Sequence, residues 1–155
     1  MRLASRAAGV LLVVGLAGCA SQSAVEPTVA APTAAAIRPS TIPVDKLVGS
    51  WGVASYRLDK DRKRTEAMAK SHCDLPYVIK KGPTDGVVMH VADDPELYEL
   101  TLKGAADGKT YLGFSAPPGD ASDRELVSFS DNLFVLRFVD RDANTRYGNM
   151  VYVRC

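Results

Sequence analysis

Short segments with alternating apolar and polar residues follow one another along most of the chain, and turn-forming residues separate them. In 96–103 we expect Tyr98, Leu100 and Leu102 to face inward, and Glu99, Thr101 and Lys103 to face outward. Alternation with a period of two is typical of half-buried β-strands. Eight strands are predicted, at 48–58, 76–81, 86–92, 96–103, 109–115, 124–130, 133–139 and 147–155. In 124–130 we expect Val127 and Phe129 to face inward and the alternate residues to face outward.

One segment breaks this pattern. Residues 62–71 contain helix-forming residues without turn residues, which predicts a short helix between the first two strands. Eight antiparallel strands between Val48 and Cys155 favour a mainly β fold, a small eight-stranded meander barrel with one short helix. Closing the sheet removes the exposed edges that an open sheet would leave. A sandwich of two sheets is the alternative.

The first residues have the form of an export signal. Arg2 and Arg6 precede an apolar run over 7–17, which is too short to span a bilayer. The run ends in Leu16-Ala17-Gly18-Cys19, which resembles the lipobox of bacterial lipoproteins. The resemblance implies that 1–18 is a signal peptide, and that Cys19 is acylated on its sulfur and then on its new amine. Several acyl chains give a stable membrane anchor where one gives only marginal binding.

The residue after the cysteine and the segment that follows it bear on location. Position 20 is alanine rather than the aspartate that marks inner-membrane retention in that family, so we expect the outer membrane, with the domain facing the periplasm. Residues 19–43 contain four prolines among alanine, serine and threonine and lack apolar periodicity. This composition predicts a disordered tether. The folded domain is expected over 44–155.

Cysteine usage predicts a cross-link. The chain has 3 cysteines, and if Cys19 carries lipid, Cys73 and Cys155 remain in an oxidising compartment, where we expect a disulfide between them. Two free thiols are one alternative. A metal site that includes His72 is the other, but no CxxC or HxxxH spacing supports it, and we expect no metal.

Charge and motifs exclude several functions. Without Arg2 and Arg6 the side-chain balance is −1, so the mature chain has no basic footprint for nucleic acid. There is no Gly-x-Ser-x-Gly elbow or phosphate-binding loop. Asp93 and Asp94 precede a proline in an expected turn, and His90 lies on an expected strand. We therefore expect neither an enzyme nor a cofactor.

Gly49-Ser50-Trp51 opens the first predicted strand and resembles the Gly-x-Trp motif of lipocalins and the wider calycin group. The resemblance implies that Trp51 plugs the closed end of the barrel. Arg154, on the last strand, is a candidate to pack over it. The domain is shorter than ordinary lipocalins. In size it is more similar to small periplasmic protease inhibitors of the calycin type, which also have a strand-one tryptophan and a single disulfide.

These observations lead to three hypotheses. The first is a membrane-anchored, non-catalytic binding module with a protein partner in the envelope, or an apolar small ligand if the barrel is hollow. The second is a proteinaceous inhibitor of a secreted or periplasmic hydrolase, which would insert Ile42–Ser50 or Ala116–Asp123 into its target. The third is a structural lipoprotein that helps to assemble envelope complexes. All three include contact with membrane lipid through the acylated Cys19.

Overall fold

The structure is a computed structural model and describes residues 37–155. The predicted signal peptide, Cys19 and most of the predicted tether therefore lie outside the described residues. Among the described residues, no helix is both long and apolar enough to cross a membrane.

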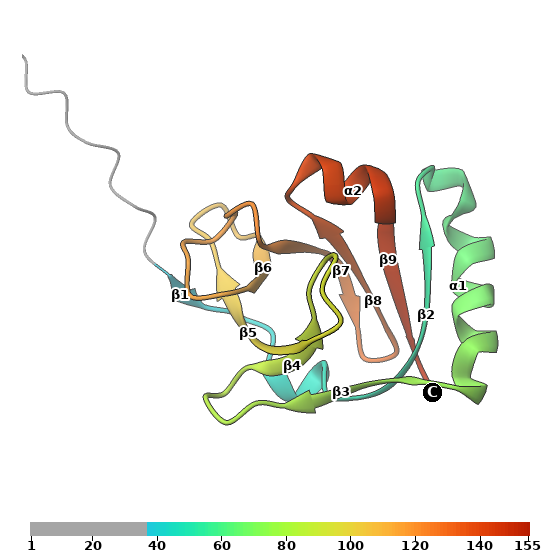
Figure 1. Cartoon of the computed structure of the whole chain (residues 1–155), viewed down its shortest axis with the longest axis horizontal. Coiled ribbons are helices and arrows are strands. Elements are labelled where there is room, and N and C mark those ends of the chain that lie inside the picture. The colour runs from blue at the N-terminus through green and yellow to red at the C-terminus, as the bar shows by residue number, and fades with distance from the viewer. Residues whose placement is uncertain (1–36) are drawn as a thin grey trace, which may run out of the picture. The chain divides into compact units, whose positions relative to one another are not determined.

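Eight antiparallel strands form a closed barrel, which confirms the predicted fold (Figure 1). They are β2 (Gly49–Tyr56), β3 (Tyr77–Lys81), β4 (Val87–His90), β5 (Leu97–Gly104), β6 (Thr110–Gly113), β7 (Arg124–Ser130), β8 (Leu133–Phe138) and β9 (Asn149–Arg154). Each strand pairs with the next along the chain, and β9 closes the ring by pairing with β2 over six residue pairs, from Trp51↔Arg154 to Tyr56↔Asn149. The β7–β8 turn is the expected two-residue turn, since Ser130 pairs with Leu133.

The barrel interior is filled by the apolar side chains that alternation places inward, together with Leu47 from the turn before β2. Its fully buried large members are Leu47, Trp51, Ile79, Met89, Leu100, Leu112, Phe134 and Leu136. The prediction for β7 is wrong in part. A register shift between Leu126 and Ser128 exchanges the two faces of the strand, so Leu126 is buried and Val127 is 40% exposed. A bulge inserts one residue on one strand and so reverses the alternation beyond it.

The helix α1 (Arg62–Ser71) has the predicted bounds and lies outside the barrel against β2 and β9 (Figure 1). Its Ala69 joins a second apolar cluster with Tyr56, Val135 and Val151. The approach is close: a Cβ on Gly52 would lie 1.9 Å from the Ala69 carbonyl oxygen. Glycine at this position of β2 is therefore what allows the helix to sit directly on the strand.

Two elements were not predicted. β1 (Arg38–Pro39) lies within the segment assigned to the tether, yet it pairs with the end of β5. A second helix, α2 (Arg141–Tyr147), separates β8 from β9. The Asp140 carboxylate accepts a hydrogen bond from the Ala143 N–H at 2.7 Å and caps this helix. Three 3₁₀ turns complete the fold: η1 (Val44–Lys46), η2 (Asp59–Asp61) and η3 (His72–Asp74).

Lys103 is buried, contrary to the expectation that it faces solvent. The loop between β6 and β7 folds over its side chain, which donates to the Asp123 carboxylate at 2.6 Å and to the carbonyl oxygens of Phe114 and Ala116. The second Asp123 oxygen accepts from the Gly119 N–H. The ammonium group therefore fixes the loop through an ion pair whose two side chains are both 0% exposed.

Candidate functional site

One end of the barrel is sealed by Trp51, as expected from the sequence. The indole ring is fully buried, and its Nε1–H donates to the Leu47 carbonyl oxygen at 2.9 Å. The Arg154 guanidinium lies over the ring at 4.1 Å from its centroid. The structure thus brings together the two residues that were predicted to pack at this end.

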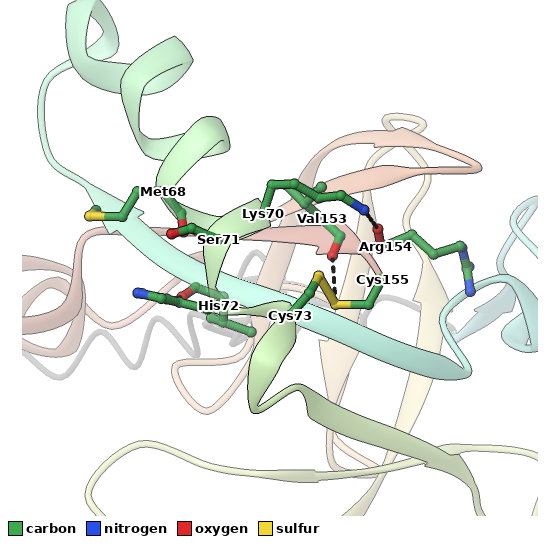
Figure 2. The surroundings of a disulfide bond; sticks show 9 residues. Met68, Lys70, Ser71, His72, Cys73, Val153, Arg154 and Cys155 are labelled. Atoms are coloured by element: carbon green, nitrogen blue, oxygen red, sulfur yellow. Dashed lines mark hydrogen bonds between the residues drawn. A yellow bond between two sulfur atoms is a disulfide. The ribbon is translucent and has the colours of Figure 1, made fainter.

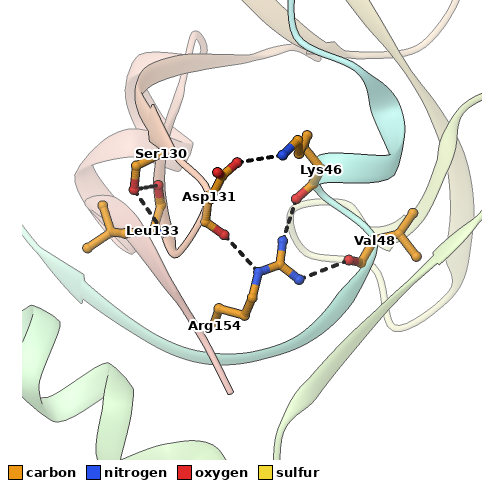
Figure 3. A network of polar contacts seen from close by, with 6 residues as sticks. All are labelled: Lys46, Val48, Ser130, Asp131, Leu133 and Arg154. Atoms are coloured by element: carbon orange, nitrogen blue, oxygen red, sulfur yellow. Dashed lines mark hydrogen bonds and ion pairs between the residues drawn. The ribbon is translucent and has the colours of Figure 1, made fainter.

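Arg154 also ties two separate segments, the β7–β8 turn and the segment that joins η1 to β2, to this end of the barrel (Figure 3). Its guanidinium donates to the carbonyl oxygens of Asp131, Val48 and Lys46, at 2.8, 3.2 and 2.6 Å. The Lys46 ammonium binds the Asp131 carboxylate at 2.7 Å and lowers the pKa of that carboxyl group. These contacts hold the β7–β8 turn, the η1 turn and the end of β9 together beside the buried indole ring.

The predicted disulfide is present, with 2.06 Å between the Cys73 and Cys155 sulfur atoms (Figure 2). It links the η3 turn to the residue that follows β9. Beside it, the Lys70 ammonium donates to the Arg154 carbonyl oxygen at 2.9 Å. The cross-link therefore holds the end of α1, the last strand and the start of β3 together.

The opposite end of the barrel holds a cavity of about 350 Å³. Its lining comes from β2, β3, β4, β7, β8, β9, α2 and the β4–β5 loop. The lining residues are Val53, Tyr77, His90, Val91, Ala92, Asp93, Asp94, Arg124, Phe138, Tyr147, Met150 and Tyr152. Apolar and aromatic side chains dominate, and the volume lies within the range of small-molecule sites.

An aromatic stack separates this cavity from the sealed end. Phe134 lies edge-on to Trp51 with ring centroids 4.7 Å apart, and it stacks on Tyr152 at 4.4 Å. Burial raises the pKa of Tyr152 to about 12, an effect that the nearby Arg124 charge opposes. The rings of Phe134 and Tyr152 therefore fill the barrel between Trp51 and the cavity.

Arg124 is the most buried of the charged side chains that line this cavity. It is 6% exposed, and its Nη2–H donates to the His90 carbonyl oxygen at 2.5 Å. Since β4 and β7 are not neighbours in the sheet, this bond crosses the barrel. The guanidinium also lies 4.9 Å from the Phe138 ring centroid. In residues 37–155, no carboxylate lies within ion-pair distance of it.

Tyr77 and His90 form a polar pair on the cavity wall. The Tyr77 hydroxyl accepts from the His90 backbone N–H at 2.9 Å and lies 3.1 Å from the His90 Nδ1. Burial raises the pKa of Tyr77, while the hydrogen bond from the His90 backbone and the charge of Arg124 lower it to a smaller extent. The β3–β4 pairing ends before His90, and the Tyr77 hydroxyl accepts the backbone hydrogen bond that a paired strand would otherwise accept there.

Asp93 and Asp94, in the β4–β5 loop, form the acidic rim of the cavity, and both already have partners. Asp93 binds both the Arg146 guanidinium and the Tyr147 hydroxyl. Asp94 accepts from the Glu96 N–H at 2.9 Å and from the Tyr98 hydroxyl at 2.7 Å. These two hydrogen bonds lower the pKa of the Asp94 carboxyl group. Both carboxylates of the rim are thus bound by neighbouring groups of the protein.

Sequence reasoning identified the sealed end and the cross-link but missed the cavity residues. With Val127 and Phe129 taken as inward, alternation places Arg124 on the outside of the barrel. The bulge after Leu126 reverses that assignment. Within the described part of the chain, no group of three or more His, Cys, Asp or Glu side chains is arranged to hold a metal ion.

Comparison with known proteins adds no further assignment. No protein family, curated protein or solved structure matches the chain.

Proposed function

We propose that this protein is an outer-membrane-anchored lipoprotein whose barrel binds a small, largely apolar molecule in the cavity at its mouth. The observation that carries the binding role is the cavity of about 350 Å³, lined mainly by apolar and aromatic side chains and set on a sealed, cross-linked barrel. Sites of this size and lining are typical for small ligands.

The lining favours binding over catalysis. Its titratable groups in the described residues are His90, Arg124, two aspartates and three tyrosines, and no serine or cysteine lies beside His90 as a nucleophile. The imidazole Nδ1 is engaged by the Tyr77 hydroxyl. A wall of this kind positions a ligand through a few polar contacts and contributes most affinity through apolar contact.

The binding role is tested with residues 20–155, exported to an oxidising compartment behind a cleavable signal. All the described strand pairs and the disulfide lie within this length. We expect the neutral fluorophore N-phenyl-1-naphthylamine to bind saturably at one site. Met150→Trp, which fills the cavity, should abolish the signal. Met68→Trp, on the exposed side of α1, should leave it unchanged. No saturable binding, or equal binding in both variants, would refute the proposal.

The anchor is tested at Cys19. The Leu16–Cys19 sequence supports acylation at this cysteine. Cys19→Ala should leave unprocessed precursor without lipid, because the lipoprotein peptidase acts after the cysteine is modified. Metabolic labelling with a fatty-acid analogue checks this, and equal labelling of the variant and the natural chain would contradict the anchor.

A second candidate function is inhibition of a periplasmic hydrolase. The loop from Ala116 to Asp123 favours it, because Lys103 holds this exposed segment in one conformation, as an inserting loop requires. The segment 42–50 is less suited, since Arg154 binds its carbonyl oxygens at the sealed end. Full activity of metalloproteases and lysozymes in the presence of the purified domain would exclude this role.

A further inference from the structure

We propose that the ligand is an anionic amphiphile, with an acid group that binds Arg124 and an apolar body that fills the rest of the cavity. This inference rests on the proposed binding function and names the chemical class of its ligand. The chemistry is that of a carboxylate or phosphate monoester on a hydrocarbon body, whether free or derived from a lipid.

The first argument is the charge of Arg124. A buried cation is costly unless an anion or several hydrogen bonds compensate it. Here the guanidinium is 6% exposed, has one hydrogen bond to the His90 carbonyl oxygen, and lies over the Phe138 ring. An acid group on the ligand would supply the missing counter-charge.

The second argument is where the remaining donors lie. A guanidinium has five N–H donors in a fork that matches a carboxylate or a phosphate. Among the described residues, the side-chain atoms that are fully buried without a partner are the Oδ1 atoms of Asn144 and Asn149. The spare N–H groups of Arg124 are therefore not sealed in the protein, and the Arg124 side chain lines the cavity.

The Tyr152 hydroxyl adds a donor to this cavity. Tyr77 and Tyr152 both line it, and both are close enough to Arg124 for its charge to act on them. The Tyr77 hydroxyl is directed to His90, whereas the Tyr152 phenol is kept protonated by burial and can donate to a ligand in addition to the guanidinium. The apolar body would lie against Val53, Val91 and Met150.

The aspartates of the rim do not cancel this preference. The Arg146 guanidinium binds the Asp93 carboxylate, and the Tyr98 hydroxyl and the Glu96 N–H bind Asp94. Both aspartates are thus held at the rim by their own partners, whereas Arg124 reaches across the barrel. An anionic head beside Arg124 would leave its apolar body between that side chain and the opposite wall.

The test compares decanoate with its neutral counterpart 1-decanol as competitors for N-phenyl-1-naphthylamine, using residues 20–155. The natural chain should bind decanoate at least about tenfold more tightly than 1-decanol. Arg124→Met should weaken decanoate about 10- to 100-fold, the range of a charged hydrogen-bonded contact, and leave 1-decanol within about threefold. Arg124→Lys should retain part of the preference.

The matched control is Arg137→Met, because Arg137 is a half-exposed arginine of β8 that already pairs with Glu125. It should not change either affinity. Equal affinity of the natural chain for decanoate and 1-decanol would overturn the inference, and so would an equal loss of both ligands in Arg124→Met. If the fluorophore still binds and Met150→Trp still abolishes its binding, the proposed function survives that failure. The comparison of the two ligands on the natural chain does not depend on any variant folding.

Discussion

Lys103 and Arg124 are both buried cations, and they differ in what surrounds their charge. Lys103 has the Asp123 carboxylate at 2.6 Å and two carbonyl oxygens, so its charge is compensated within the fold. Arg124 follows Asp123 directly in the chain, but it faces the barrel interior and has one carbonyl oxygen as its hydrogen-bond partner in the described residues. The first cation stabilises a loop, and the second is the one that we propose binds the ligand.

This contrast predicts that replacement by methionine affects stability to very different extents at the two positions. Lys103→Met should lower the free energy of unfolding by about 3 to 5 kcal/mol, because the Asp123 charge is left buried and unpaired. Arg124→Met should change it by less than about 1 kcal/mol, since a lost hydrogen bond is offset by removal of an uncompensated charge. Urea denaturation of both variants checks this. Equal losses would show that Arg124 is structural, and Lys103→Met with Asp123→Leu should recover most of the loss.

A second prediction at this scale concerns alkaline pH. Burial raises the pKa of Tyr152 to about 12 from 10.0, so the native state holds this proton more tightly than the unfolded chain. The resulting stability is complete below pH 10 and is lost as the pH rises through 12, by about 2 to 3 kcal/mol in total. Unfolding free energies between about pH 9 and about pH 11.5 should fall less steeply for Tyr152→Phe than for the natural chain. Parallel curves would contradict the assignment.

At the scale of elements, alternation and helix-forming composition were sufficient for the eight strands and for α1. Alternation and helix-forming composition are both local patterns of the sequence, and packing in the core leaves the resulting elements unchanged. α2 and β1 were missed for different reasons. The Asp140 cap and Gly148 lie on either side of a polar heptapeptide without an apolar face, and β1 is defined by its partner β5 rather than by its own sequence.

The residues of the candidate site could likewise be predicted only in part. Trp51 with Arg154 could be predicted from the resemblance to the Gly-x-Trp motif. Cys73 with Cys155 could be predicted because the chain has 3 cysteines and Cys19 is expected to carry lipid. Arg124 could not be predicted, since its direction depends on a bulge two residues later. A shift of one residue in a strand exchanges its faces, and the sequence carries no separate signal for it here.

The contact between α1 and β2 predicts a steric effect. Gly52→Ala would place a methyl group 1.9 Å from the Ala69 carbonyl oxygen, so the helix must move away from the strand. We expect a loss of about 1 to 3 kcal/mol in the free energy of unfolding. Ser55→Ala, at an exposed position of the same strand, should stay within about 0.5 kcal/mol. Similar values for the two variants would show that the helix is loosely attached.

At the scale of the whole molecule, the disulfide joins segments 82 residues apart. Cys155→Ser should lower the free energy of unfolding by about 2 to 5 kcal/mol, because the unfolded chain then loses a large covalent loop. The fold should persist, since a domain of this size buries a working core. The check is thermal and urea denaturation of the oxidised chain and the variant. Alkylation of both cysteines without reductant in the natural chain would show that the cross-link is not formed.

The sparse pairing of β3 has a consequence for how fast a ligand exchanges. β3 shares three residue pairs with β2 and two with β4, whereas β9 shares six with β2 and five with β8. Segments with few ladder bonds open at the lowest free energy. Tyr77, at the start of β3, lines the cavity, and Cys73 fixes the chain just before it. Transient opening of β3, next to the cysteine that fixes the chain, would set the rate at which bulky ligands enter and leave the cavity. Their exchange rate should therefore rise steeply with temperature.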